Sequence, residues 1–573
     1  MKNIYKQFLL LNIIFILFFL SACDSGKEGE YDYDVIIRGG LIYDGSGNEP
    51  YINDIGIIGD TINLINQLES ATAIKNIDAN GLVVAPGFIN MLSWATTSLI
   101  QDGRAMSDIK QGVTLEIMGE GSSMGPMNDS MKTDALNKQG NIKYDIEWTT
   151  LNEYLEYIVK KGISPNVASY IGATTVRIHE IGYEDRKATD EEIQRMQDLV
   201  RQAMQDGALG VGSSLIYTPA NFADTDELIA LVNAAAEYDG KYISHIRSEG
   251  DRLEEAVQEL IKISSITGAP AEIYHIKAAG KNNWHKLENI LNMIEFARAS
   301  GLRISANMYP YMAGATGLDA TMPPWVQEGG HNAWVENLKD MDIRKKVSGE
   351  MKDHETTWEN FFSLTGPKNI LLLGFKNPKL QNLTGKTLAE VSAQRGIEAT
   401  ETAMNLVVED DSRVNAAFFL MSENNIRKKI RRSWISFGSD ASAIANEGVF
   451  LHSNQHPRAY GNFSKVLSHY VRENGDITLS EAIGRMTSLP AFNAGIRGRG
   501  LLKENYYADI VIFDPNTISD KATYENPHQY SEGMKHVFIN GIQVLEDGDH
   551  TGALPGRVVR GPGWIGWPNN SMQ

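Results

Sequence analysis

Between about residues 86 and 490 the sequence alternates short strand-like runs with longer helical runs, and this alternation limits the possible folds more than any other feature. Runs rich in β-branched and aromatic residues predict strands, whereas apolar residues spaced three or four apart predict amphipathic helices. Strands are expected at Gly112–Met118, Asn166–Ile171, Val211–Ser214, Tyr242–His245, Glu272–His275, Arg303–Asn307 and Ile435–Gly438. Helices are expected at Glu191–Gln205, Asp226–Tyr238, Leu253–Thr267 and His285–Ser300. This series of strand–helix units favours a closed (β/α)8 barrel over a doubly wound sheet, and in such a barrel chemistry collects at the C-terminal ends of the strands.

The two ends of the chain are rich in short strands instead. Strand-like runs occur in residues 34–85 and return in residues 491–573, with Ala508–Pro515 as the clearest example of the second group. Because a few short strands do not bury a core on their own, both ends are expected to assemble into one small β-sandwich beside a barrel of residues 86–490. Residues 325–430 are too many for a single loop, and we interpret them as an inserted subdomain or lid.

The composition narrows the possible functions. The 573 residues are 42% apolar and 22% charged, as in packed globular proteins. The 72 acidic residues outnumber the 53 basic ones, and the resulting net charge of −19 repels phosphate backbones, so nucleic acid is not an expected partner. Because Cys23 is the only cysteine, an intramolecular disulfide and a cysteine-rich zinc site are both excluded.

The N-terminus has the pattern of a secretion signal. Lys2 and Lys6 precede the apolar run Phe8–Leu20, which at ~1.5 Å per residue reaches only about 20 Å, short of the ~30 Å of a bilayer core. Residues 1–22 and Cys23 resemble a bacterial lipoprotein signal with the lipobox Leu-Ser-Ala-Cys. The resemblance implies cleavage before Cys23 and its lipidation, which would anchor the protein to a membrane of the cell envelope, with residues 23–33 as an acidic tether. An ordinary secretory signal with a chance cysteine is the alternative.

Three ionisable residues are expected where strands end, namely His245, His275 and Asp440. Adjacent parallel strands lie ~4.8 Å apart, so imidazoles on neighbouring strands can share one metal ion, although a third ligand is then required. A packed, hydrogen-bonded histidine is the alternative for either imidazole alone, and Asp440 alone could cap the following turn. The three together favour a metal site, because burying so much polarity without a ligand is costly.

A series of short segments spread along the chain carries a resemblance to a known family. The segments are Val84–Asn90, Gln111–Thr114, Ser244–Glu249, Tyr274–Gly280, Tyr309–Tyr311, Gly438–Asp440, His456–Gly461, Met486–Ala491, Ala508–Pro515, Tyr524–Gly533 and His550–Arg557. In them the sequence resembles the N-acyl-D-amino-acid deacylases, or D-aminoacylases, of the amidohydrolase superfamily. The resemblance implies a metal-dependent barrel that hydrolyses the amide of a small N-acyl amino acid with a metal-activated water.

Two departures from that family change the expected metal site. Where family members carry two histidines for a first metal position, this chain has Leu92 and Trp94, which offer zinc no useful lone pair, so that position is expected to be empty. Where the family often has a metal-binding cysteine, Glu120 stands in a Gly-Glu-Gly context that resembles a related subgroup. The resemblance therefore implies one zinc ion held by Glu120, His245 and His275, with one position left for water. A solvated loop carboxylate is the alternative for Glu120.

The resemblance also implies roles for further residues. Asp440 is expected to act first as general base and then as general acid. Lys277 and Tyr309 are expected to bind the carboxylate of the substrate, and Arg458 is a further candidate because a guanidinium pairs with a carboxylate through two hydrogen bonds. A surface position is the alternative for Lys277.

Two other functions remain open. The same barrel and metal could act on a dipeptide, a cyclic imide or a lactam, which only the loops and residues 325–430 would distinguish. The loss of the histidine pair and of the cysteine would also fit a metal-free binding lipoprotein, against which the retention of His245, His275 and Asp440 argues.

Overall fold

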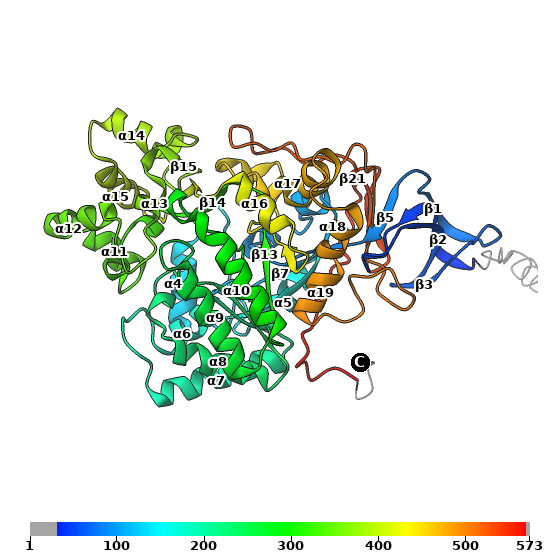
Figure 1. The fold of residues 1–573 in the computed structure, drawn as a ribbon, viewed down its shortest axis with the longest axis horizontal. Coiled ribbons are helices and arrows are strands. Elements are labelled where there is room, and N and C mark those ends of the chain that lie inside the picture. The colour runs from blue at the N-terminus through cyan, green and yellow to red at the C-terminus, as the bar shows by residue number, and fades with distance from the viewer. Residues whose placement is uncertain (1–30, 569–573) are drawn as a thin grey trace, which may run out of the picture.

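A computed structural model describes residues 31–568, and its centre is a barrel of parallel strands (Figure 1). In order around the barrel the strands are β6 (Phe88–Asn90), β7 (Val113–Met118), β8 (Asn166–Ser169) with its continuation β9 (Ile171–Gly172), β10 (Gly210–Ser214), β11 (Lys241–His245), β12 (Ala271–Ile273), β13 (Ile304–Met308) and β17 (Ile435–Phe437). The barrel closes between β6 and β17, where the Met91 amide donates to the Phe437 carbonyl at 3.3 Å and Ser93 forms a parallel bridge with Ala441. The described residues thus form the predicted eight-stranded barrel.

Helices cover the outside of the barrel. They are α2 (Thr96–Gln101), α3 (Met106–Ile109), α4 (Asp129–Lys138), α5 (Leu151–Lys161), α6 (Ala173–Glu180), α7 (Asp190–Gln205), α8 (Thr225–Ala236), α9 (Leu253–Thr267), α10 (Leu287–Ala299), α16 (Glu423–Ile430), α17 (Arg458–Lys465), α18 (Leu479–Met486) and α19 (Ser488–Ala494). Thr189 caps the N-terminus of α7 by accepting the Glu192 amide with its hydroxyl, and Asp224 caps that of α8 by accepting the Glu227 amide with its carboxylate. The four helices predicted from the sequence match α7 to α10 within two residues at each boundary.

The two ends of the chain share one sheet. Its strands are β1 (Tyr33–Ile42), β2 (Tyr51–Ile58), β3 (Thr61–Asn66), β4 (Ala73–Asp78), β5 (Val83–Pro86), β18 (Ile510–Phe513), β19 (Met534–Ile539), β20 (Ile542–Glu546) and β21 (Asp549–His550). Strand β5 joins the two groups, because it pairs with β1 on one side and with β18 on the other. The predicted β-sandwich is therefore one continuous hydrogen-bonded sheet. Ile510 and Ile512 share a core with Ile37 of β1, whereas Val511 and Phe513 pack in the core of the barrel.

A second hydrophobic core lies in the long excursion between β13 and β17. It contains β14 (Ala313–Gly317), β15 (Ile370–Leu372), β16 (Asn415–Phe419), α11 (His331–Asn337), α12 (Met341–Lys352), α13 (Phe361–Thr365), α14 (Leu388–Arg395) and α15 (Ala399–Asp410). This insertion subdomain begins at β14, earlier than residue 325, because β14 pairs with β16. It ends before α16, whose Ile426 and Ile430 pack in the barrel core. In Figure 1 the insertion subdomain and the sheet of the chain ends lie on opposite sides of the barrel.

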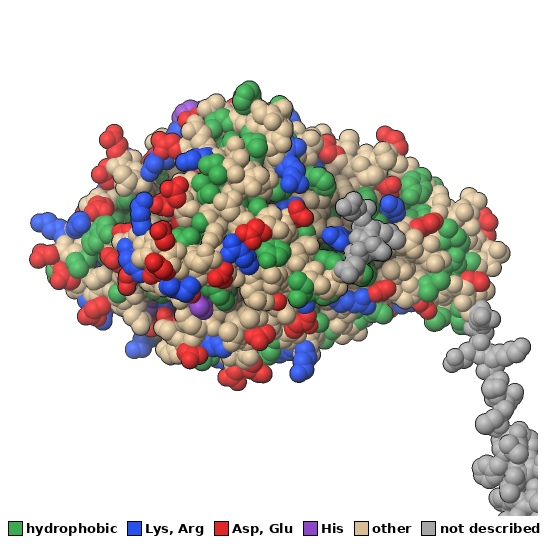
Figure 2. All heavy atoms as spheres, turned by 90° about the horizontal axis from the view of Figure 1, so that it is seen from below, with side chains coloured by type: hydrophobic (Ala, Val, Ile, Leu, Met, Phe, Trp, Pro, Cys, Tyr) green, Lys and Arg blue, Asp and Glu red, His purple; other side chains and the backbone are tan. Residues whose placement is uncertain are grey.

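The surface carries charges of both signs. On the face shown in Figure 2, Lys and Arg side chains are interspersed with Asp and Glu, and apolar side chains are scattered among them. Such mixing prevents a strong field of one sign over that face. Within residues 31–568, no helix combines the length and apolarity needed to cross a bilayer.

Candidate active site

The side chains of interest meet at the C-terminal ends of the barrel strands. Glu120 follows β7, His245 is the last residue of β11, and His275 comes two residues after β12. Tyr309 directly follows β13, and Asp440 comes three residues after β17. Because parallel strands present their carboxyl ends at one rim of the barrel, these five residues line a single cleft of about 870 Å³.

Glu120, His245 and His275 form a buried cluster with the donor chemistry of a metal site. Glu120 Oε1 lies 3.1 Å from His245 Nδ1 and 2.9 Å from His275 Nε2, and the three donor atoms all lie within 4.8 Å of one another. The three residues are only 5%, 4% and 3% exposed. Zinc bound by such ligands at ~2.0–2.2 Å holds them roughly 3.3 Å apart, so these residues fit one divalent ion with little rearrangement. Among residues 31–568, no other group of three His, Cys, Asp or Glu comes together in this way.

The charges of this cluster stabilise one another. Burial disfavours the carboxylate of Glu120, but the imidazoles of His275 and His245 outweigh burial and hold the pKa of Glu120 well below its usual range. Burial and the Lys277 ammonium disfavour the imidazolium of His275, whereas the carboxylates of Glu249 and Glu120 raise the pKa of His275 to about 9. A metal ion that binds at Nε2 of His275 therefore competes with a tightly held proton.

Glu249 and Lys277 hold His275 from the side opposite Glu120. Glu249 Oε1 lies 3.1 Å from His275 Nδ1 and accepts from Lys277 Nζ at 2.5 Å. Burial disfavours the Glu249 carboxylate, but Lys277 and the two imidazoles hold its pKa well below the usual range. A carboxylate behind a metal-ligating imidazole fixes the ring and strengthens it as a donor. Glu249 was not predicted from the sequence, and its position four residues after His245 is the signal that could have identified it.

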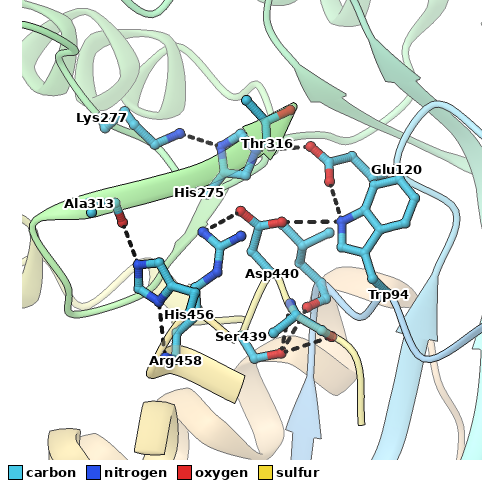
Figure 3. Close-up of polar contacts among 12 residues, drawn as sticks. Trp94, Glu120, His275, Lys277, Ala313, Thr316, Ser439, Asp440, His456 and Arg458 are labelled. Carbon is cyan, nitrogen blue, oxygen red and sulfur yellow. Dashed lines mark hydrogen bonds and ion pairs between the residues drawn. The ribbon is translucent and has the colours of Figure 1, made fainter. Parts of the chain in front are cut away.

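Asp440 faces this cluster from the last barrel strand. Its Oδ2 pairs with Arg458 Nη1 at 2.8 Å, and its Oδ1 accepts from the Trp94 indole at 3.1 Å (Figure 3). Burial raises the pKa of Asp440, Arg458 opposes that shift and the charge of Glu120 adds to it. The backbone φ is +51° at Asp440 and +34° at His275, values that residues with side chains rarely adopt. Such strain is concentrated at functional sites, where the surrounding structure maintains it.

The residues predicted to bind the substrate carboxylate also line the cleft. The Arg458 guanidinium carbon lies 4.5 Å from the centre of the Tyr309 ring, and Lys277 Nζ lies 5.8 Å from the same centre. Both cations already have a carboxylate partner, Asp440 for Arg458 and Glu249 for Lys277. Arg458, Tyr309 and Lys277 thus form one side of the cleft, and each cation there would share its charge between a protein carboxylate and a substrate.

A tryptophan that follows the first barrel strand lines the cleft at a position where the sequence resemblance implied a histidine. The Leu92 side chain is 1% exposed and packs inside the barrel. Trp94 instead lines the cleft, and its indole N–H donates to Glu120 Oε2 at 2.9 Å and to Asp440 Oδ1. The sequence identified Trp94 only as a missing ligand, because no sequence pattern predicts where an indole N–H points. Cys23, the expected lipidation site, lies outside the described residues.

Comparisons with known proteins agree with this architecture. A family model described as "Amidohydrolase family" matches residues 379–545. The D-aminoacylase of Alcaligenes xylosoxydans xylosoxydans is 31% identical over 531 residues, which cover 92% of this chain and 97% of that protein. A crystal structure of D-aminoacylase superposes with a TM-score of 0.77 at 30% identity, over 92% of this chain and all of the other. An N-acyl-D-glutamate deacylase from Bordetella bronchiseptica, complexed with zinc and a phosphonate inhibitor that mimics the tetrahedral intermediate, superposes with a TM-score of 0.76 at 28% identity, over 92% of this chain and 99% of that one.

The closed parallel barrel, with a buried carboxylate and two imidazoles at its C-terminal rim, defines the protein as an amidohydrolase. Its similarity to D-aminoacylase makes it a hydrolase of C–N bonds other than peptide bonds. Within the class, the chain belongs to the D-aminoacylase family.

Proposed function

We propose that the protein removes the acyl group from N-acyl-D-amino acids and that it uses one zinc ion bound by Glu120, His245 and His275. The observation that carries the proposal is that these three buried residues and Asp440 share one cleft at the C-terminal rim of the barrel. A divalent ion bound there would polarise the acyl carbonyl and lower the pKa of a water molecule to about 7. Relatives named D-aminoacylase and N-acyl-D-glutamate deacylase support the substrate class.

Asp440 acts as general base and then as general acid in this proposal. It accepts the proton of the attacking water and later delivers it to the leaving amine. Arg458 and Trp94 each contact a different oxygen of the Asp440 carboxylate, which restrains its rotation. Each oxygen still has a second lone pair for the proton, and a base held in one orientation loses less entropy when it reacts.

The charges of the site support a substrate with a free carboxylate. Glu120, Glu249 and Asp440 bring three negative charges, and Lys277 and Arg458 bring two positive charges. With neutral imidazoles and one divalent ion, the site would carry a net charge of about +1, which attracts an anionic substrate. One carboxylate on the substrate would then bring the whole complex to neutrality.

The location of the protein is a separate proposal. The apolar run Phe8–Leu20 followed by Cys23 supports a lipid on Cys23 and an anchor in a membrane of the cell envelope. Residues 23–33 would then hold the barrel away from the membrane surface. Mass spectrometry of the N-terminal peptide from the membrane fraction tests this proposal, since an unmodified Cys23 would contradict it.

A substrate screen tests the proposed reaction. Purified protein is assayed against N-acyl-D-amino acids, their L enantiomers, D-dipeptides, cyclic imides and lactams, with Asp440→Asn as the matched inactive variant. We expect the N-acyl-D-amino acids to be hydrolysed fastest and Asp440→Asn to lose about 10²–10⁴-fold in kcat. Preferred hydrolysis of another group would replace the substrate class. A zinc content below about 0.1 per chain after zinc-replete expression would favour a metal-free binding protein.

A further inference from the structure

We infer that Trp94 has two functions in the catalytic centre. Its indole N–H positions Glu120 and Asp440 relative to one another, and it occupies the place where a second cation would bridge these two carboxylates. The inference rests on the proposed function in one respect, since it makes Trp94 a positioning residue for the same reaction. Trp94 also limits the site to one metal ion.

The indole N–H stands between two carboxylates that serve different purposes. Trp94 Nε1 lies 2.9 Å from Glu120 Oε2 and 3.1 Å from Asp440 Oδ1 (Figure 3). Glu120 presents its other oxygen, Oε1, to both imidazoles, and Asp440 presents its other oxygen, Oδ2, to Arg458. One indole therefore links the metal-binding carboxylate to the general base without using the oxygen atoms that contact the imidazoles and Arg458.

The backbone fixes Trp94 opposite Asp440. The two residues lie on either side of the seam at which β6 and β17 close the barrel. The Trp94 amide donates to the Ala441 carbonyl at 2.9 Å, and the Asp440 amide donates to the Leu92 carbonyl at 2.9 Å. The Ser442 hydroxyl donates to the Trp94 carbonyl at 3.0 Å. Because these bonds belong to the barrel itself, the position of the indole does not depend on a mobile loop.

The indole also takes the place of a second cation. An ion bridging Glu120 and Asp440 would lie ~2.0–2.2 Å from an oxygen of each, in the space that Nε1 and its hydrogen now fill. An indole N–H is a donor without a usable lone pair, so Trp94 cannot join such an ion as a ligand. Its partial positive charge moderates the repulsion between the two carboxylates, as a bridging cation would. The wild-type site should therefore bind a single ion even when zinc is in excess.

The cleft provides a matched control. Trp94 is 36% exposed, so Trp94→Phe removes the N–H, keeps an aromatic ring and disturbs little packing. Trp334 lines the same cleft from the insertion subdomain, and its Nε1 has no hydrogen-bond partner within the described part of the chain. Trp334→Phe therefore removes an indole N–H without removing a hydrogen bond. Because Trp334 is only 2% exposed, its melting curve measures the packing that this substitution loses. Trp94→His is the converse change, because it places a lone pair where the indole has a proton.

The experiment measures bound zinc and turnover in these four proteins, each confirmed as folded by its thermal melting curve. Zinc per chain is determined by elemental analysis after equilibration with excess zinc and rapid desalting. We expect about one ion in the wild type and in Trp334→Phe, and also in Trp94→Phe, because phenylalanine opens the space but supplies no lone pair to a second ion. We expect about two ions in Trp94→His. With an N-acyl-D-amino acid, we expect kcat to fall about 10- to 100-fold in Trp94→Phe while KM changes less than about threefold, and kcat in Trp334→Phe to stay within about twofold of the wild type.

Three results would overturn the inference. They are two zinc ions per wild-type chain, one ion in a folded Trp94→His, or equal kcat values in Trp94→Phe and Trp334→Phe. A wild type that hydrolyses no N-acyl-D-amino acid would refute the proposed function instead. The zinc stoichiometries of the wild type and Trp94→His would then still decide whether the indole excludes a second ion.

Discussion

The substitution Glu249→Gln tests how the protein prepares His275 as a metal ligand. Glu249 is 2% exposed, and its Oε1 lies 3.1 Å from His275 Nδ1 and accepts from Lys277 at 2.5 Å. Glutamine keeps the shape but loses the charge that makes the imidazole a stronger donor. Changes to such partners typically reduce metal affinity about 10- to 100-fold, so we expect the Kd for zinc to rise by that factor, or about 1.4–2.7 kcal/mol. Competition with a chromophoric chelator at pH 7.5 measures the change.

The substitution also leaves the Lys277 ammonium buried without a full counter-charge, and breaking a buried ion pair costs about 3–5 kcal/mol of folding stability. A control must therefore separate lost affinity from lost stability. Glu227→Gln serves this purpose. Glu227 lies on α8, outside the metal-ligand cluster, is 5% exposed and pairs with the buried Arg177 of α6 at 2.5 Å. We expect Glu227→Gln to lose a similar amount of folding stability, measured by urea unfolding, but to keep the wild-type Kd for zinc. Equal affinity loss in the two variants, or wild-type affinity in Glu249→Gln, would refute the role given to Glu249.

Three further predictions concern the metal and the base. Glu120→Ala should lose both bound zinc and activity, because it removes the only anionic ligand, and zinc retained at wild-type affinity would contradict the ligand set. Asp440→Asn should keep about one zinc ion per chain while losing turnover, so that joint loss of both would make Asp440 a ligand rather than the base. Zinc binding at pH 7.5 should release about one proton from His275, because the pKa of this residue is about 9. The release should disappear as the pH rises through 9. Calorimetry in buffers of different ionisation enthalpy measures the number of protons released. Because that pKa lies above the ~6.5 of an unfolded histidine, the contribution of His275 to metal-free stability is full below ~6.5 and is lost as the pH rises through 9.

The barrel was predictable because the residue patterns of its strands and helices are local in the sequence. The strand β11 ends at His245, as expected, and α9 spans Leu253–Thr267, as expected, since a buried strand and an amphipathic helix each have a clear period. The start of the insertion subdomain was not predictable. The residues of β14, Ala313–Gly317, have little intrinsic preference for a strand, and their strand conformation depends on pairing with β16, about a hundred residues later. The assembly of both chain ends into one β unit was predictable from their short strands, whereas the pairing of β5 with β1 on one edge and with β18 on the other was not.

In the site, too, the residues marked by local sequence patterns were predictable, and those that depend on long-range contacts were not. Glu120, His245, His275 and Asp440 could be singled out because strand ends in a parallel barrel converge on one rim. The roles of Glu249 and Trp94 depend on the directions of their side chains, which strand and helix periods do not specify. Both residues act through hydrogen bonds to groups more than 20 residues away in the chain, Glu249 to Lys277 and Trp94 to Glu120 and Asp440.

The most direct test of the account is an anomalous difference map, measured at the zinc absorption edge, from crystals of the protein grown with zinc. We predict one peak per chain in the cleft, ~2.0–2.2 Å from Glu120 Oε1, His245 Nδ1 and His275 Nε2, with the Trp94 indole still between Glu120 and Asp440. A map with no peak among these three side chains, or with the peak held by other residues, would contradict the account.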